Sequence, residues 1–531
     1  MNRRIAVFDS TLRDGAQGEG ISFSVGDKLK IVEILDNLGV KYIEAGNPGS
    51  NPKDLEFFGL AKGLKLKNSL LAAFGSTRRR DMAAADDENN VRSMLLAETP
   101  VVVIFGKSWD FHVTGVLKTT LEENLNMIRD TVAFFKGEGR EVIFDAEHFF
   151  DGARANEEYA FQTLKAAAEA GADSLVLCDT NGGSFPSEVY DRTAKAVLEF
   201  SIPIGIHCHN DDGMAVANSV MAVEAGAAHV QGTLIGIGER CGNANLSTLI
   251  PTLQIKRGYA CIPDDCLQRL TPTARLVAEL SNMQLSSSLP YVGKSAFAHK
   301  GGMHIDAVLK DTRTVEHIEP ETVGNERRIL MSEVSGRSTI LAKVRKICPE
   351  IDKESRQAKE IVDLLKDMEH KGYQYEGAEP SFELLVRRHL GKYKPFFELE
   401  KTTIIEGQSS RDGGTSSSAM IIINVEGERR ISAAEGDGPV NALDRALRVA
   451  LETFYPELRH VHLTDYKVRV LNPEDATAAK VRVWIESTDG ADSWTTVGVS
   501  TDILEASCRA LIDSIEYKLL KNIERKMRPF I

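Results

Sequence analysis

The sequence lacks the features that mark a secreted or membrane-bound chain. Its seven cysteines follow no disulfide-framework spacing, which favours a reducing compartment. The N-terminal segment MNRRIAVFDS contains no signal-peptide core. No apolar run reaches the roughly 18 residues of a membrane-spanning helix. We therefore predict a cytoplasmic protein that is neither exported nor embedded in a membrane.

An excess of positive charge is also missing. The chain has 64 Lys and Arg residues against 77 Asp and Glu residues, which gives a formal net charge of -13. Nucleic-acid binding depends on clustered cations that neutralise phosphates, so we predict that nucleic acid is not a partner. Hydrophobic residues make up 42% and charged residues 27%, which is typical of a globular protein.

Apolar runs that resemble strands alternate with amphipathic stretches that resemble helices through the first half of the chain. Eight such units, from a strand at Ile5–Asp9 to one at His229–Leu234, occupy about 255 residues, and this count predicts a (β/α)8 TIM barrel. A doubly wound open sheet is the alternative. Polar clusters follow strands one, five, six, seven and eight, which favours convergence on one barrel mouth.

The pattern changes twice beyond the barrel, so we expect three regions. Residues 1–260 form the barrel, residues 261–400 form mainly helical linker subdomains, and residues 401–531 form a C-terminal α+β domain. In the last region a strand-strand-helix order occurs twice, and Ala442 recurs in register as Ala506. We therefore predict a duplicated β-β-α unit.

Two stretches place metal-binding side chains at strand ends. The first, FDSTLRDGAQ, puts Arg13 and Asp14 after strand one, where they could hold a metal and a developing negative charge together. The second, HCHND, carries His207 and His209, which face one side of strand seven because side chains alternate. Imidazole and carboxylate ligands suit Mg, Mn, Zn or Fe(II). These residues therefore predict a metal site. Because two histidines and one carboxylate also bind iron in non-haem oxygenases, an oxygenase is the first alternative interpretation.

Further polar residues follow the other strands. Glu147, after strand five, is a candidate base, and Thr180, after strand six, could bind a substrate carboxylate. Asn243, in the loop after strand eight, could give a carbonyl oxygen to the metal. Each alone is weak evidence, because Asp-Thr-Asn-Gly is also turn chemistry and Asn243 could simply cap a helix.

Together these motifs resemble a known family. FDSTLRDGAQ, HCHND and GERCGNANL resemble the metal-dependent acyltransferase barrels that include the 2-isopropylmalate, homocitrate and citramalate synthases. DAEHFFDG, LCDTNGG, SAFAHKGGMH and EHIEPETVGNERR resemble the longer bacterial citramalate synthases. The resemblance spans nearly the whole chain.

The resemblance implies a condensation of acetyl-CoA with pyruvate and water that gives (R)-citramalate and CoA. Asp14, His207 and His209 would bind a divalent cation (Mn, Mg or Zn), with Asn243 near or in its coordination shell. The metal would polarise the keto group of pyruvate as a Lewis acid, and Arg13 would stabilise the developing alkoxide.

The resemblance also assigns the remaining site residues. Thr180 would hold the pyruvate carboxylate, with Asp145 and Ile104 also in the substrate site. Ile104 would replace a histidine of the isopropylmalate synthases and so favour a small apolar pocket. Glu147 and His304 are candidates for proton transfer, and His304 would reach the mouth from the partner subunit of a homodimer.

Three features leave alternatives open. Arg78–Arg80 could bind the second carboxylate of a homocitrate synthase substrate. Family members commonly carry a tyrosine where this chain has Val315, and Ile235 stands where the loop after strand eight usually has another residue. Either departure could lower activity, and a barrel without catalysis would leave an amino-acid sensor.

The C-terminal region resembles the family's leucine- or isoleucine-sensing domain. We expect allosteric inhibition by isoleucine, because citramalate feeds its synthesis by the threonine-independent route. A purely structural dimerisation domain is the alternative.

Overall fold

The computed structural model describes residues 3–330, 337–352, 355–408, 415–471, 478–490 and 492–527. These residues divide into two compact units. The first comprises residues 1–298 with 316–327, and the second comprises residues 299–315 with 328–531. The segment 261–400, expected as helical linker subdomains, is therefore shared between the two units.

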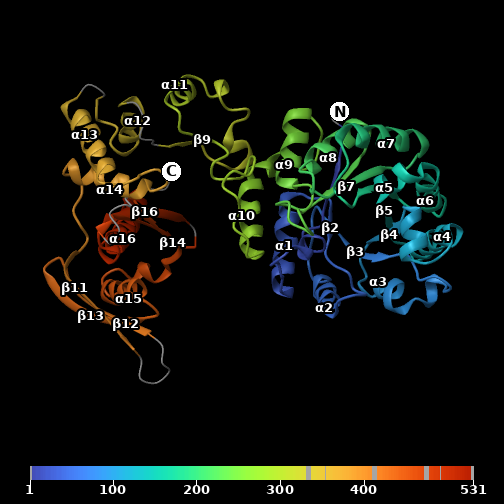
Figure 1. Ribbon diagram of the computed structural model, residues 1–531, viewed down its shortest axis with the longest axis horizontal. Coiled ribbons are helices and arrows are strands. Elements are labelled where there is room, and N and C mark those ends of the chain that lie inside the picture. The colour runs from blue at the N-terminus through green and yellow to red at the C-terminus, as the bar shows by residue number, and fades with distance from the viewer. Residues whose placement is uncertain are drawn as a thin grey trace. The chain divides into compact units, whose positions relative to one another are not determined.

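Eight parallel strands close into a barrel in the first unit, with neighbours in sequence order and β8 paired to β1 (Figure 1). The strands are β1 (Ala6–Asp9), β2 (Tyr42–Glu44), β3 (Leu70–Ser76), β4 (Val101–Lys107), β5 (Glu141–Glu147), β6 (Ser174–Asp179), β7 (Ile204–Cys208) and β8 (His229–Gly232). This closed barrel confirms the predicted (β/α)8 fold. Its strands are parallel because each apolar run is followed by a helix that returns the chain to the same end of the barrel.

Helices connect and extend the barrel strands. They are α1 (Val25–Leu38), α2 (Pro52–Ala61), α3 (Ser93–Leu96), α4 (Leu121–Gly137), α5 (Phe149–Ala155), α6 (Glu157–Glu169), α7 (Pro186–Glu199), α8 (Ala215–Glu224), α9 (Leu246–Pro251) and α10 (Leu270–Leu280). Helix α1 shows how the sequence sets their ends. Ser24 and Asp27 form a reciprocal capping box, and Gly39 ends the helix with φ of 90°.

Side-chain parity separates two apolar layers in the barrel. One cluster, which includes Phe8, Val103, Ile143 and Val176, fills the barrel interior. The alternate residues of the same strands join the larger cluster between strands and helices. At the carboxyl end of the strands the inward positions become polar, so the site is built above an apolar plug.

The second unit contains two three-stranded antiparallel sheets, each followed by a helix. The first repeat is β11 (Glu398–Gln408), β12 (Thr415–Val425), β13 (Glu428–Gly436) and α15 (Pro439–Leu451). The second is β14 (His462–Val470), β15 (Val481–Thr488), β16 (Ser493–Ser500) and α16 (Ile503–Met527). The duplication is present, but each repeat has three strands where two were expected. The additional strands, β11 and β14, are mostly exposed edge strands, so no apolar run marks them.

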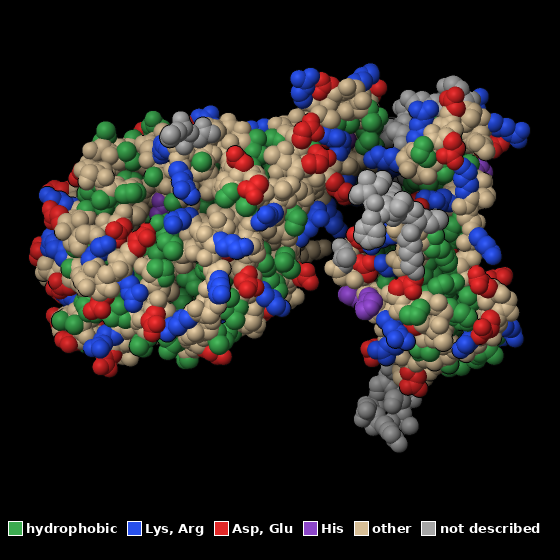
Figure 2. Space-filling model, turned by 180° about the vertical axis from the view of Figure 1, so that it is seen from behind, with side chains coloured by type: hydrophobic (Ala, Val, Ile, Leu, Met, Phe, Trp, Pro, Cys, Tyr) green, Lys and Arg blue, Asp and Glu red, His purple; other side chains and the backbone are tan. Residues whose placement is uncertain are grey.

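The remaining elements are short strands and helices between the barrel and these sheets. They are β9 (Ala298–His299), α11 (Gly302–Lys310), β10 (Arg328–Ile329), α12 (Arg337–Ile347), α13 (Arg356–His370) and α14 (Glu379–His389). No helix among the described residues is long and apolar enough to cross a bilayer. Figure 2 shows Lys and Arg side chains interspersed with Asp and Glu over the face in view.

Candidate functional site

Asp14 is presented to the barrel mouth by the turn that follows β1. The backbone N–H of Asp14 donates to Oγ of Ser10 at 3.2 Å, and that of Gly15 donates to the Ser10 carbonyl at 3.0 Å. A short 3-10 turn, Gly15–Gln17, follows. This tight turn leaves Arg13 and Asp14 at the strand's carboxyl end, as the sequence predicts.

Asp14, His207 and His209 converge there as one buried cluster. Oδ2 of Asp14 lies 3.6 Å from Nε2 of His207 and 3.7 Å from Nε2 of His209. One ligand atom from each residue lies within 4.8 Å of the others. Ligands on a common ion with bonds of about 2.1 Å lie roughly 3 to 3.6 Å apart, so the three side chains fit a divalent metal.

Asn243 adds a fourth polar group. Its Nδ2 donates to Oδ1 of Asp14 at 2.9 Å, whereas its Oδ1 is buried with no hydrogen-bond partner among the described residues. A buried carbonyl without a partner is costly. Amide oxygens coordinate cations, and this one belongs to a side chain that already contacts Asp14, so the orphaned atom supports the fit.

The charges in the cluster favour the metal-binding protonation state. Burial raises the pKa of Asp14, but the charge of Arg13, helped by the neighbouring imidazoles when they are protonated and by the hydrogen bond from Asn243, outweighs it and holds that pKa well below its usual range. Burial lowers the pKa of His207 to about 4 and lowers the pKa of His209 as well. At neutral pH the carboxylate is ionised and both imidazoles are neutral, which is the state that binds a metal.

Arg13 is held by two carboxylates and a ring. Its Nε donates to Oε2 of Glu44 at 2.6 Å, and its Nη1 donates to Oδ2 of Asp14 at 3.0 Å. The guanidinium also lies 3.9 Å from the centre of the Phe74 ring. Three contacts fix the planar group beside the metal-binding cluster.

Thr180 and Glu147 lie at neighbouring strand ends. Oγ1 of Thr180 accepts from the backbone N–H of His148 at 2.8 Å, and its own O–H, which has no acceptor among the described residues, can donate to a substrate oxygen. Glu147 forms an ion pair with Lys107. Arg240 ties the loop after β8 to this edge by donating to the Thr180 carbonyl at 2.7 Å and to both Asp211 oxygens.

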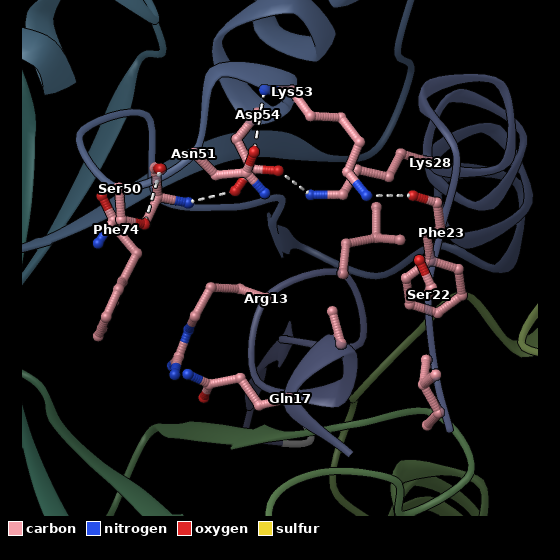
Figure 3. A pocket seen from close by; sticks show the side chains of 14 residues that line it. Arg13, Gln17, Ser22, Phe23, Lys28, Ser50, Asn51, Lys53, Asp54 and Phe74 are labelled. Carbon is pink, nitrogen blue, oxygen red and sulfur yellow. Dashed lines mark hydrogen bonds and ion pairs between the residues drawn. The ribbon is translucent and has the colours of Figure 1, made fainter. Parts of the chain in front are cut away.

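A cavity of about 260 Å³ opens beside Arg13 (Figure 3). Arg13 and Gln17 from the turn after β1 line one side in this view, and Lys28, Lys53 and Asp54 line the other. Nζ of Lys28 donates to Asp54, and the wall mixes these polar side chains with apolar ones such as Phe23 and Phe74. The arrangement leaves an open approach to the Arg13 guanidinium.

Three family descriptions match successive parts of the chain. Residues 4–277 match the family described as HMGL-like. Residues 291–373 match the homocitrate synthase post-HMGL domain-like family, and residues 376–519 match the LeuA allosteric (dimerisation) domain.

Curated relatives match over almost the whole length. The (R)-citramalate synthase of Aquifex aeolicus is 53% identical over 525 residues, which cover 99% of this chain and 99% of the relative. That of Geobacter sulfurreducens is 50% identical and covers 98% of each chain. The chain belongs to the citramalate synthase family. A probable 2-isopropylmalate synthase of Methanopyrus kandleri is more distant, at 34% identity over 97% of this chain and 98% of the relative.

One residue expected in the substrate pocket of a citramalate synthase family member lies elsewhere. Ile104 is fully buried in the layer between the strands and the helices, so it does not line the mouth. Its neighbour Phe105 has the inward parity of Val103, and its ring stacks on Phe74 with centroids 5.1 Å apart. The sequence predicted that Ile104 lines the pocket, whereas the next residue, Phe105, has the inward direction. The two could not be told apart from the sequence because both faces of β4 are apolar.

Asp145 also differs from the expected contact with substrate. It is 3% exposed, and its Oδ1 accepts from Nε2 of Gln231 at 3.1 Å. Arg78, considered as a substrate cation, is instead paired with Glu123 and Asp130 at 2.8 and 2.7 Å. Its side chain is therefore committed to a structural ion-pair network.

His304 and Val315 belong to the second unit, and His304 is exposed on α11. A role for His304 in the site stays a prediction. Ile235, which stands where members of the citramalate synthase family usually have another residue, is partly buried and packs against the main core of the first unit. This packing favours the interpretation that the departure does not disturb the loop.

The sequence analysis missed Glu44, Gln231, Lys107 and Phe105. Each stands on an inward parity position at or near the carboxyl end of its strand. Counting by twos from a recognised inward residue would have found Lys107 and Phe105 once the parity of β4 was known. Glu44 and Gln231 carry no motif of their own, since their partners come from other strands.

Proposed function

We propose that this protein condenses acetyl-CoA with pyruvate and water to give (R)-citramalate and CoA in isoleucine biosynthesis. The observation that carries the proposal is the buried cluster of Asp14, His207 and His209 with Arg13 beside it, in a chain 53% identical to an (R)-citramalate synthase over its full length. This donor set and a fixed cation suit a reaction that builds negative charge on a keto oxygen.

A divalent cation, Mn, Mg or Zn, is proposed as the cofactor. Asp14, His207 and His209 would hold it, and the orphaned Oδ1 of Asn243 would complete the protein's share of the shell. Bound there, the ion supplies Lewis acidity toward the keto group of pyruvate.

The remaining groups have distinct roles in the proposal. Arg13 hydrogen-bonds the oxygen on which charge develops, because Glu44 and Asp14 fix its plane. Thr180 donates its free O–H to the pyruvate carboxylate. The stacked rings of Phe74 and Phe105 close a small apolar space for the methyl group.

Acetyl-CoA approaches through the cavity beside Arg13 in this proposal. The cavity has both polar and apolar walls and shares Arg13 and Phe74 with the mouth, so a thioester placed there lies next to the keto acid. Glu147, which forms an ion pair with Lys107, is the candidate for moving the methyl proton, and His304 of the partner subunit is the second candidate. The reaction ends when water cleaves the thioester and releases CoA.

Thiol release from acetyl-CoA tests the activity. We expect release with pyruvate and a divalent metal, and none after chelation. Asp14→Asn is expected to abolish it, whereas the control Asp173→Asn, just before β6 at the opposite end of the barrel, keeps it. Preference for 2-oxoisovalerate or 2-oxoglutarate would assign a different synthase, and oxygen uptake without thiol release would indicate an oxygenase.

We further propose that the second unit forms a homodimer and binds isoleucine as an inhibitor. The match to an allosteric (dimerisation) domain over residues 376–519 supports this proposal. Isoleucine should lower thiol release by the full-length protein at saturating substrate. Loss of activity with leucine alone, or a monomer by light scattering, would contradict it.

A further inference from the structure

His207 is held on the side away from Asp14 by two further buried side chains. Its Nδ1 lies 2.9 Å from Oε1 of Gln231, and Nε2 of Gln231 donates to Oδ1 of Asp145 at 3.1 Å. The three residues come from β7, β8 and β5, and none is more than 5% exposed. A fixed polar chain therefore crosses the barrel interior and ends on a metal-binding imidazole.

The amide of Gln231 decides which ring nitrogen of His207 carries the proton. Opposite an amide oxygen, Nδ1 has to be the donor, so Nε2 keeps its lone pair toward Asp14. With the amide reversed, an N–H would face Nδ1. The ring proton would then sit on Nε2, the atom that lies 3.6 Å from Oδ2 of Asp14, and no lone pair would be left for a cation.

Asp145 contacts the other end of the same amide. Oδ1 of Asp145 accepts the N–H of Gln231, and the amide oxygen is the atom that faces Nδ1 of His207. His209 has no such support, since its Nδ1 is buried with no hydrogen-bond partner among the described residues. The two histidines of the cluster therefore differ, and only His207 is held in one orientation.

We propose that Gln231, which is hydrogen-bonded to Asp145, is the positioning residue that keeps His207 in its metal-binding tautomer. The proposal rests on the proposed metal site, and it goes beyond the ligand set to the residues that prepare it. Groups that hydrogen-bond the second nitrogen of a ligating histidine fix its ring and its tautomer, and their loss typically costs about 10- to 100-fold in metal affinity.

Two measurements on the full-length protein test this role. The first is the tautomer of His207 in metal-free protein, read from nitrogen-15 imidazole spectra, with His209 as the internal reference. We expect the proton on Nδ1 of His207 in the native protein. The second is the affinity for Mn²⁺ and Zn²⁺, measured by competition with a chromogenic chelator.

Gln231→Leu removes the acceptor without adding charge. We expect a mixture of His207 tautomers, an unchanged His209 signal, and metal affinity lower by about 10- to 100-fold. Gln231→Glu keeps an oxygen toward Nδ1 and should retain most of the affinity. Ser174→Ala is the matched control, because this buried hydroxyl contacts His229 in the barrel and not the cluster.

A native-like affinity in Gln231→Leu, or a proton on Nε2 of His207 in the native protein, would overturn the proposal. Should Gln231→Leu fail to fold, the native tautomer and the affinity of Gln231→Glu still decide it. If the native protein binds neither ion, the metal site itself fails, and the tautomer measurement separately shows whether Gln231 orients His207.

Discussion

Arg13 shows how one residue depends on its neighbours at the residue scale. It is largely buried between Glu44 and Asp14, with 12% of its side chain exposed, and Ser10 donates a further hydrogen bond to Glu44. Removing one member of a buried charged pair leaves the other charge uncompensated, which is far more costly than an exposed pair. The arrangement therefore fixes the plane of the guanidinium, as the proposed role of Arg13 beside a developing oxyanion requires.

Arg13→Lys tests that geometry. Lysine keeps the charge but has no planar fork, so it cannot bond Glu44 and Asp14 and face a third oxygen at once. We expect the rate constant of thiol release to fall by about 10²- to 10³-fold. Arg257→Lys, in an exposed pair with Glu224, is the matched control. Native turnover in Arg13→Lys would contradict the role of Arg13 in charge stabilisation.

Phe105 and Ile104 form a natural pair of opposite parity on β4. Phe105→Ala removes the ring that stacks on Phe74 and should shift preference from pyruvate toward longer 2-oxoacids by about 10- to 200-fold. Ile104→Ala should lower stability by about 2–5 kcal/mol and leave the preference unchanged. Two measurements distinguish the variants: the ratio of kcat/KM for pyruvate to that for 2-oxobutyrate reports the preference, and thermal melting reports the stability. A change of preference in Ile104→Ala but not in Phe105→Ala would show that Ile104, and not Phe105, lines the pocket.

At the element scale, α16 carries a buried carboxyl that ties it to the start of the C-terminal sheet. Glu516 is 1% exposed and accepts the backbone N–H of Phe396 at 3.1 Å. Burial raises the pKa of Glu516 to about 7 from the ordinary value of 4.5, although backbone hydrogen bonds from Phe396 and Phe397 oppose the shift. The folded helix therefore binds this proton more tightly than the unfolded chain does.

The sign of the pH dependence follows directly. Below about pH 4.5 the carboxyl is neutral in both states, and between about 4.5 and 7 only the unfolded state ionises, so stability falls as pH rises. Above about 7 the full cost, about 3 kcal/mol, is present. Glu516→Gln should flatten this slope in calorimetric melts between pH 5 and 8. Glu457→Gln is a surface control, and equal slopes in all three proteins would contradict the assignment.

At the scale of the whole molecule, the helices before the C-terminal sheets do not form a core of their own. Apolar side chains of α12, α13 and α14 share one cluster with Val497 of β16 and pack against Trp484 of β15. Arg387 pairs with Glu524, and Arg388 pairs with Asp513, both on α16. These helices therefore depend on the sheets that follow them.

Two truncations should behave differently for that reason. Deleting residues 401–531 exposes the apolar faces of α12–α14, so we expect dye binding, loss of helicity and aggregation. Deleting residues 328–531 leaves the main core of the first unit intact, since its last member is Val323. That fragment should melt cooperatively by circular dichroism. A soluble, fully helical 1–400 fragment would contradict the shared core.

The sequence by itself determined the barrel and the metal-binding cluster. Alternating apolar runs and helices allow few parallel topologies, and the i, i+2 spacing of His207 and His209 puts both on one face of a strand. Asp14 and Arg13 follow from a turn whose glycine ends the first strand.

Tertiary structure alone decided the rest, for a physical reason. On β4 both faces are apolar, one against the plug and one against the helices, so periodicity could not show that Phe105 and not Ile104 faces the mouth. The chain from His207 through Gln231 to Asp145 joins β7, β8 and β5, and closure of the barrel brings these strands' side chains together. Edge strands β11 and β14 gain their order from pairing, and only a few partly buried side chains, such as Leu399 and Leu463, pack against the core, which is too few to form a clear apolar pattern.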